Sequence, residues 1–242
     1  MVNDTKAYDQ WHEAVHGKEN RLVLKLEDWH QNVLGFLPSL QGLSVLEVGC
    51  GPGDFAIYLA NQGASVTAVD FSPKAIEIAQ EKANYQEKSV KFQVADAQSL
   101  PFDSNFFDLV VSCECLEHVP VPQLALNEIS RVLKPSGKLV LTTENYSNAM
   151  LLYWLACWLR KEPFNSGEQV QPIEHFFLFW QVKRMFHQAG LRVNHLLGSH
   201  HVFLLLPRFH PHTFVIERFQ NLLIATLMRP LARHMTFEAI KR

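Results

Sequence analysis

Val45-Leu-Glu-Val-Gly-Cys-Gly-Pro-Gly-Asp-Phe-Ala56 joins an apolar run, a glycine-rich turn and the start of an apolar helical pattern. A continuous apolar run is typical of a strand that is buried on both faces of a sheet, and glycine makes so tight a turn without strain. The bare N–H groups at a helix start can approach a ligand closely and favour negative charge. The stretch therefore predicts a strand, a loop and a helix that together bind a nucleotide or a nucleoside.

The spacing of the glycines narrows the choice of ligand. Gly49, Gly51 and Gly53 are followed by Asp54, which stands where a dinucleotide fingerprint has its third glycine. The loop also lacks the lysine of a phosphate-binding P-loop. Glu47, just before the glycines, would oppose a pyrophosphate and suit a positively charged ligand. These residues indicate a cationic nucleoside, and S-adenosylmethionine, with its sulfonium and amino groups, is the obvious one.

The composition bounds the kind of protein. The 242 residues are 48% hydrophobic and 19% charged, which indicates a globular chain long enough for a sizeable core. The formal net charge of -2 gives no global attraction to nucleic acid. Residues 1–11 lack the apolar core of a signal peptide, and no run reaches the roughly 18 apolar residues that span a bilayer. The four cysteines follow no disulfide or metal spacing, and we expect a soluble, cytoplasmic protein.

Strand-like and helix-like segments alternate along the chain. Strands are expected over residues 43–49, 64–69, 90–95, 107–112 and 138–143, and helices over residues 54–62, 73–83 and 123–133. This alternation predicts an α/β fold with a doubly wound parallel sheet. Beyond residue 145, helices are expected over residues 179–188 and 213–228 and strands over residues 191–197 and 234–240.

We predict a single domain with an inserted cap. The first residues, which include Tyr8 and Trp11, have two open interpretations, a frayed end held by aromatic packing or a lid over the cofactor. A helix is expected over residues 21–37, which Pro38 ends. The expected parts are an N-terminal lid and helix (1–40), a cofactor-binding core (41–145), substrate-cap elements with helical insertions after strands five and six (146–230) and a final strand (231–242).

Polar residues follow four of the expected strands. Glu47 lies at the end of the first strand, Asp70 ends the second, Asp96 ends the third, and Cys113 and Glu114 follow the fourth. In a doubly wound sheet, ligands bind at the carboxyl ends of the strands beside the topological switch point. The sequence therefore predicts that these residues meet at one site.

With these residues set out, the chain resembles the class I S-adenosylmethionine-dependent methyltransferases. The resemblance implies a seven-stranded, Rossmann-like sheet whose last strand is antiparallel. The chain is similar in particular to the small-molecule branch of this family, which includes ubiquinone- and menaquinone-pathway enzymes. The matching blocks are Glu47-Val-Gly-Cys-Gly-Pro-Gly53, Val66-Thr-Ala-Val-Asp-Phe-Ser72, Val94-Ala-Asp-Ala-Gln-Ser-Leu-Pro-Phe102, Phe107-Asp-Leu-Val-Val111 and Arg131-Val-Leu-Lys-Pro-Ser-Gly-Lys-Leu-Val140.

The resemblance implies roles for residues on the second and third strand ends. Asp70 would accept hydrogen bonds from both ribose hydroxyls of S-adenosylmethionine, with a helix cap as the alternative. Asp96 would bind the adenine amine and the N–H of Ala97 an adenine ring nitrogen, unless Asp96 is only a solvated loop carboxylate. Phe71 would lie against the adenine face or, equally, serve as a core aromatic.

Roles at the methionine end of the cofactor are implied in the same way. Glu47 would face the amino group, directly or through a water, and the backbone carbonyl of Cys113 would accept from the same amine. The loop that would bind the cofactor and its product, S-adenosylhomocysteine, contains Gly49, Cys50, Gly51 and Gly53.

Histidines are the candidate bases for methyl transfer. The reaction is an in-line displacement for which positioning and exclusion of water supply most of the acceleration, while an oxygen or nitrogen acceptor often needs deprotonation. By position, His118 is the best candidate for this catalytic role. His175 and the pair His200–His201 border the expected cap, and a lone histidine is more often structural.

The sequence Glu114-x-x-Glu117-His118 also allows a metal site. Two carboxylates and an imidazole within one turn could hold a divalent cation such as Mg²⁺ that polarises substrate hydroxyls. Similar patterns occur in relatives with and without magnesium, and the alternative is that Glu117 and His118 cap the next helix. We predict no metal here.

The favoured function is O-methylation of a small, lipophilic or glycosylated acceptor. The alternatives are N- or C-methylation of a quinone or natural-product type of substrate, and a non-catalytic S-adenosylmethionine-binding module. Nucleic acid is disfavoured because the fourth strand end lacks the Asn/Asp-Pro-Pro-Tyr/Phe block that holds a flipped base. The apolar segments 150–159 and 214–228 could dock on a membrane, although burial in the cap explains them as well. The oligomeric state is left open.

Overall fold

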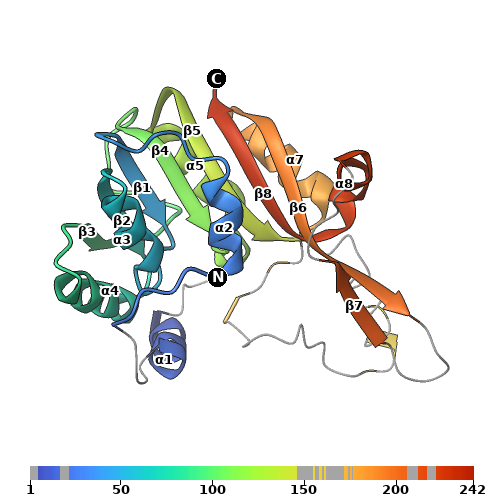
Figure 1. The fold of residues 1–242 in the computed structure, drawn as a ribbon, viewed down its shortest axis with the longest axis horizontal. Helices are drawn as coiled ribbons and strands as arrows, with labels where there is room; N and C mark the ends of the chain where they lie inside the picture. Colours follow the sequence, from blue (N-terminus) through green and yellow to red (C-terminus); the bar gives the residue numbers. More distant parts are fainter. Residues whose placement is uncertain are drawn as a thin grey trace.

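The fold is seen in a computed structural model, in which helices flank a single twisted sheet (Figure 1). It describes residues 5–16, 22–145, 155, 158–159, 161, 172–173, 175, 177–205, 212–216 and 222–242. Within these residues the sheet has eight strands in the order β3-β2-β1-β4-β5-β8-β6-β7. Their bounds are β1 Ser44–Val48, β2 Ser65–Asp70, β3 Lys91–Val94, β4 Phe107–Cys113, β5 Leu133–Glu144, β6 Leu191–Leu205, β7 His212–Ile216 and β8 Ala232–Lys241.

Seven of these strands confirm the predicted fold. The pairs β1–β2, β2–β3, β1–β4 and β4–β5 are parallel, so the carboxyl ends of β1 to β5 lie along one edge. The final strand β8 inserts antiparallel between β5 and β6, as the family resemblance implies. An eighth strand, β7, pairs antiparallel with the end of β6 and extends the sheet beyond these seven.

Helices cover both faces of the sheet. The helices are α1 Thr5–His16, α2 Asp28–Leu34, α3 Asp54–Asn61, α4 Pro73–Tyr85, α5 Pro122–Val132, α7 Phe179–Gln188 and α8 Leu222–Met228, with short 3₁₀ turns η1 Leu116–His118 and η2 Arg229–Leu231. Apolar residues of α2 and α3 pack on one face, and those of α5 and α7 pack on the other. The predicted start of α4 is confirmed, because the Ser72 hydroxyl accepts from the N–H of Ala75 and Pro73 is the first helical residue.

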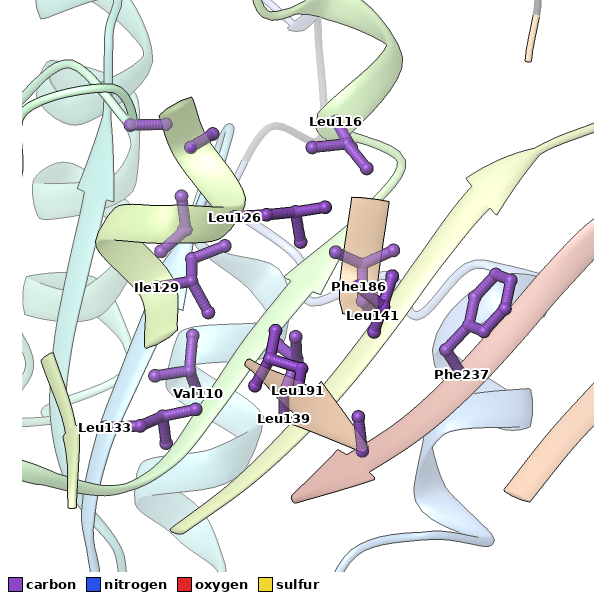
Figure 2. Packing of buried hydrophobic residues seen from close by; sticks show 14 of the residues in the cluster. Val110, Leu116, Leu126, Ile129, Leu133, Leu139, Leu141, Phe186, Leu191 and Phe237 are labelled. Atoms are coloured by element: carbon purple, nitrogen blue, oxygen red, sulfur yellow. The ribbon is translucent and has the colours of Figure 1, made fainter. Parts of the chain in front are cut away.

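The core under α5 and α7 holds the strands together (Figure 2). Leu126 of α5 and Phe186 of α7 are fully buried against strand residues that include Leu141 and Phe237. Burying side chains of this size contributes about 1.5–3 kcal/mol each to folding. The strand ends that carry the polar residues are therefore anchored on a rigid support.

Two expected helices are shorter than their patterns predict. The helix expected over residues 21–37 forms only at Asp28–Leu34. The preceding residues are held in another way, because the N–H of Lys25 donates to the Asp54 carboxylate at 2.7 Å. The helix expected over residues 213–228 is a strand at His212–Ile216 and a helix at Leu222–Met228. Thr, Phe, Val and Ile favour a strand when an edge such as that of β6 is available for pairing.

Part of the expected cap falls on residues that the structure does not describe. Residues 146–154, 156–157, 160, 162–171, 174, 176, 206–211 and 217–221 lie outside the described part of the chain, and the helical cap stays a prediction. Leu155, Trp158 and Leu159 are described, and each exposes a large part of its side chain. Within the part of the chain that is described, no helix has the length and apolarity that a bilayer span requires.

Candidate active site

The glycine loop between β1 and α3 has a backbone that requires glycine. Gly49, Gly51 and Gly53 all have positive φ angles, of 75°, 49° and 80°. A Cβ on Gly53 would lie 2.8 Å from the Cβ of Ala79, and one on Gly49 would overlap the side chain of Cys115. The loop thus packs closely against α4 and against the residues after β4. It leads directly into the start of α3, where backbone N–H groups can face a ligand.

Asp70 connects the end of β2 to this loop. One of its oxygens accepts from the N–H of Gly51 at 2.8 Å, and the other accepts from the N–H of Ser72 at 2.9 Å. Each carboxylate oxygen has two lone pairs, so this arrangement leaves capacity for two ribose hydroxyls. Cys50 has a buried thiol, and its N–H donates to the carbonyl of Val69.

Glu47 has a buried oxygen that lacks a hydrogen-bond partner. The residue is 2% exposed, and no described group donates to its Oε2. Burial raises the pKa of Glu47 well above the usual value, and the nearby carboxylates of Asp54 and Asp70 raise it further. An unpaired buried carboxyl oxygen is costly, and a cationic ligand group would relieve that cost. The residues present therefore fit the amino group of S-adenosylmethionine.

Asp54 makes a buried contact that its position after the glycines does not predict. Its Oδ2 forms a buried ion pair with Nζ of Lys82 at 2.6 Å. This pair ties the first turn of α3 to α4 at the base of the loop.

The third strand end contributes Asp96 and Ala97. The Asp96 carboxylate accepts from the N–H of Gln98 at 2.9 Å, and the Gln98 amide also donates to it. Ala97 is buried beside it. The strand ends at Glu47, Asp70 and Asp96 thus belong to the neighbouring parallel strands β1, β2 and β3.

Helix α1 lies over the glycine loop. The Tyr8 hydroxyl donates to the carbonyl of His118 at 3.1 Å, and the Tyr8 ring meets Phe71 edge-on with centroids 6.0 Å apart. Asp9 accepts from the Ser72 hydroxyl and from the N–H of Lys74. These contacts fit both interpretations of the N-terminal residues, a segment held by aromatic packing and a lid over the cofactor.

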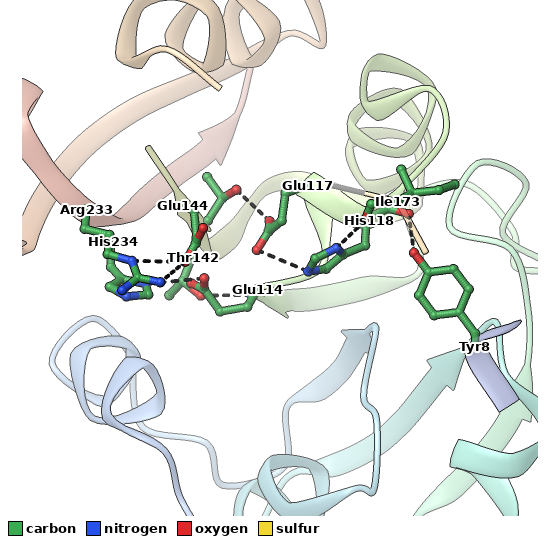
Figure 3. Close-up of polar contacts among 10 residues, drawn as sticks. Tyr8, Glu114, Glu117, His118, Thr142, Glu144, Ile173, Arg233 and His234 are labelled. Atoms are coloured by element: carbon green, nitrogen blue, oxygen red, sulfur yellow. Dashed lines mark hydrogen bonds and ion pairs between the residues drawn. The ribbon is translucent and has the colours of Figure 1, made fainter. Parts of the chain in front are cut away.

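Glu114 follows the end of β4 and lies beside Thr142 and His234 (Figure 3). Cys113, the last residue of β4, is buried opposite Thr142 of β5. Glu114 has a φ of 45°, and its N–H donates to the backbone and hydroxyl oxygens of Thr142. Its carboxylate lies 3.3 Å from Nδ1 of His234 on β8. Left-handed backbone at a residue other than glycine is concentrated at functional sites.

A second carboxylate, Glu144, completes the cluster around His234. Glu144 lies directly opposite His234 in the β5–β8 pair and binds Arg233 at 3.0 Å. Burial tends to lower the pKa of His234, but the carboxylates of Glu114 and Glu144 outweigh it and raise the pKa above its usual value. The cluster therefore has its own cations to balance its two carboxylates.

The same cluster has the spacing of a cation site. One ligand atom each from Glu114, Glu144 and His234 lies within 4.8 Å of the others. A divalent ion there would compete with Arg233 for Glu144 and with the imidazolium form of His234 for Glu114. We therefore treat it as an internally neutralised cluster.

Glu117 and His118 make their hydrogen bonds outside this cluster. Glu117 accepts from the Thr143 hydroxyl at 2.6 Å, and burial together with the Glu114 charge raises its pKa well above the usual value. Nδ1 of His118 lies 2.6 Å from the carbonyl oxygen of Ile173, which makes it a donor to that oxygen. The Glu-x-x-Glu-His pattern is thus divided between two hydrogen-bond networks (Figure 3).

The other candidate histidines have separate positions. The N–H of His175 donates to the carbonyl of Glu117, and its ring stacks on Phe177. His200 meets His234 edge-on with ring centroids 5.1 Å apart. The side chain of His201 lies outside the described residues.

Sequence reasoning missed His234, Glu144 and Arg233. The expected strands 138–143 and 234–240 could have been paired antiparallel. That pairing places the end of the first strand beside the start of the second, and it would have predicted that Glu144 lies near Arg233 and His234.

Comparisons with known proteins agree on one family. A family model of the methyltransferase domain matches residues 46–141. The chain is 36% identical over 203 residues to a ubiquinone biosynthesis O-methyltransferase of Coxiella burnetii, covering 81% of this chain and 82% of that protein. It is 34% identical over 226 residues to a demethylmenaquinone methyltransferase of Staphylococcus aureus, covering 81% and 86%.

A solved structure, a SAM-dependent methyltransferase from Aquifex aeolicus, matches 97% of this chain and 98% of its own length with a TM-score of 0.62. At 19% identity, this likeness concerns the fold alone.

Proposed function

Because this chain belongs to the class I S-adenosylmethionine-dependent methyltransferases, we propose that it methylates an oxygen of a small, lipophilic acceptor of the quinone-pathway type. The observation that carries the proposal is the 36% identity, over most of both chains, to a ubiquinone biosynthesis O-methyltransferase. A hydroxylated aromatic ring is the acceptor class that this relative's name implies. The compartment is proposed to be the cytoplasm.

The cofactor roles are proposed from the strand ends. Asp70 binds the ribose hydroxyls, Asp96 and the N–H of Ala97 bind the adenine, and Phe71 lies against the adenine ring. Glu47 faces the methionine amino group, where its buried Oε2 would gain a cationic partner. Cys113 offers its carbonyl to the same amino group.

The chain accelerates the reaction mainly by positioning. When bound, S-adenosylmethionine supplies an electrophilic methyl group on its sulfonium. The loop that contains Gly49, Cys50, Gly51 and Gly53 holds S-adenosylmethionine in place, and helix α1 covers this site and excludes water from it. Holding two reactants in line converts a bimolecular step into an effectively unimolecular one, which can remove several kcal/mol from the barrier.

Replacement of Asp70 tests the cofactor assignment. Asp70→Ala should abolish measurable binding of S-adenosylhomocysteine in calorimetry while circular dichroism stays unchanged. Asp103→Ala, at an exposed loop position, is the matched control and should bind as the unmodified protein does. Equal binding by both variants would refute the cofactor site.

A panel of acceptors tests the reaction. Hydroquinones, catechols and naphthoquinols of increasing tail length are incubated with S-adenosylmethionine, and products are analysed by mass spectrometry and NMR. A new O-methyl signal is expected. A methyl group on ring carbon would instead favour C-methylation, which the similarity to a demethylmenaquinone methyltransferase supports as the second candidate.

A further inference from the structure

His234 occupies an enclosed position at the carboxyl edge of the sheet. It lies on β8, with only 11% of its side chain exposed, and its ring stacks at 25° to Trp29 of α2. Nδ1 lies 3.3 Å from Oε2 of Glu114. Among the residues that the structure describes, none makes a hydrogen bond to Nε2. Nδ1 thus faces a carboxylate in an ion pair without hydrogen-bond geometry, while Nε2 is available to a ligand.

The residues after β4 place this imidazole beside the cofactor loop. Cys115 packs against Gly49, so the segment that follows β4 borders the glycine loop. Glu114, the residue before Cys115, has a left-handed backbone, and its carboxylate pairs with His234. A molecule bound beside His234 would therefore lie near the segment that borders the proposed site for the methionine end of the cofactor.

From this juxtaposition we propose that His234 is the base that takes the proton from the acceptor hydroxyl, and that Glu114 positions its ring. The inference rests on the proposed O-methylation. Nε2 accepts the hydroxyl proton as the oxygen lone pair forms a bond to the methyl carbon. The carbon–sulfur bond breaks and its electron pair returns to sulfur, so the products are the methyl ether, S-adenosylhomocysteine and the imidazolium of His234.

The charges around the ring suit this step. Glu114 and Glu144 stabilise the imidazolium that forms, as an acidic partner does for a histidine base. The other titratable or charged groups facing the cluster are Arg233, His200, His30, Glu117 and His118. His30 is held neutral, because burial lowers its pKa to about 4. Arg233 is neutralised by Glu144.

His118 is the competing base. Its Nδ1 donates to the carbonyl of Ile173, and the other ring nitrogen lies 3.9 Å from the Glu117 carboxyl. It also lies on the Glu117 network, whereas Glu114 pairs with His234. The two histidines can therefore be separated by mutation.

The test compares His234→Gln with Glu114→Gln, His118→Gln and the control His187→Gln. His187 is exposed in the last turn of α7, away from the cluster. S-adenosylhomocysteine affinity is measured by calorimetry, and kcat is measured against pH with a hydroquinone acceptor. His234→Gln should lower kcat by about 100-fold or more with cofactor affinity unchanged, since general-base catalysis contributes at least that factor. The control should keep both values.

The pH profile gives a signature that a structural role would not produce. The base must be neutral, so the rate of the unmodified enzyme should fall on the acidic side with a midpoint above 6.5. Glu114→Gln removes a carboxylate from the imidazole and should move this midpoint to lower pH. The Glu114→Gln shift also tests the proposal if His234→Gln fails to fold.

The outcomes separate the inference from the proposed function. No methyl transfer by the unmodified protein to any hydroxyl acceptor rejects O-methylation, and the base with it. Transfer that survives in His234→Gln but is lost in His118→Gln rejects the His234 assignment alone. An unchanged acidic midpoint in Glu114→Gln would also overturn it.

Discussion

Asp54 and Lys82 form a buried ion pair that links the glycine loop to helix α4. Their side chains are 10% and 4% exposed, and Oδ2 and Nζ lie 2.6 Å apart. Asp54 also accepts from the N–H of Lys25, so one carboxylate joins three segments of the chain. The residue that distinguishes this loop from a dinucleotide fingerprint is therefore a structural anchor.

Replacing Lys82 by Met should destabilise the protein by about 3–5 kcal/mol, because it leaves the Asp54 charge buried without its partner. The free energy of unfolding is measured in urea. Lys25→Met is the matched control: the Lys25 ammonium pairs with Glu27 on the surface, and its loss should cost about 1 kcal/mol or less. Equal losses in the two variants would show that burial of the Asp54–Lys82 pair has no consequence.

A pair of glycine substitutions separates backbone strain from steric overlap. Gly42 and Gly53 have similar φ angles of 74° and 80°, but a Cβ would have no neighbour within 4 Å at Gly42 and would lie 2.8 Å from Ala79 at Gly53. Gly42→Ala should cost about 1–2 kcal/mol from left-handed backbone alone. Gly53→Ala should cost about 1–3 kcal/mol more because of overpacking. Denaturant midpoints of the two variants measure the difference, and equal midpoints would contradict it.

The sequence was sufficient for most of the core because the decisive signals are local. The apolar run before Gly49 and the acidic residues Asp70 and Asp96 are each read within a few residues of a strand end. Parallel pairing then brings those ends to one edge without further information. The seven-stranded sheet and its antiparallel last strand follow from the same motifs through the family resemblance.

Contacts between distant segments were not predictable in this way. Lys82 meets Asp54 from 28 positions away, and His234 meets Glu114 only after β8 has inserted beside β5. Residues 213–216 suit either a helix or a strand, and pairing with β6 decides for a strand. The part of the site that the sequence did not predict thus depends on the register and pairing of strands that are distant in the chain.

Removing the charge of Glu47 should change how stability depends on pH. Burial raises the folded-state pKa of Glu47 above its ordinary value of 4.5, so the folded chain binds more protons than the unfolded chain. Stability without cofactor should therefore fall as pH rises from about 4.5 toward the raised value. Glu47→Gln removes this decline, and its melting temperature relative to the unmodified protein should be higher at pH 8 than at pH 5. A difference in melting temperature that is the same at pH 5 and pH 8 would contradict the burial of the Glu47 carboxyl group.

Asp9 should control how long the cofactor stays bound. It fastens α1 to the start of α4 through the Ser72 hydroxyl and the N–H of Lys74. Asp9→Ala removes these bonds without touching the core, and a loss of about 1 kcal/mol should make S-adenosylhomocysteine dissociate about fivefold faster.

Stopped-flow fluorescence, with Trp11 on the same helix as the reporter, measures the dissociation rate. Gln10→Ala is the matched control, because Gln10 is exposed on the adjacent position of α1 and should leave the rate unchanged. If α1 is a lid, Asp9→Ala should accelerate release while the melting temperature of the cofactor-free protein changes little. A lower melting temperature with an unchanged release rate would instead show that α1 only stabilises the fold.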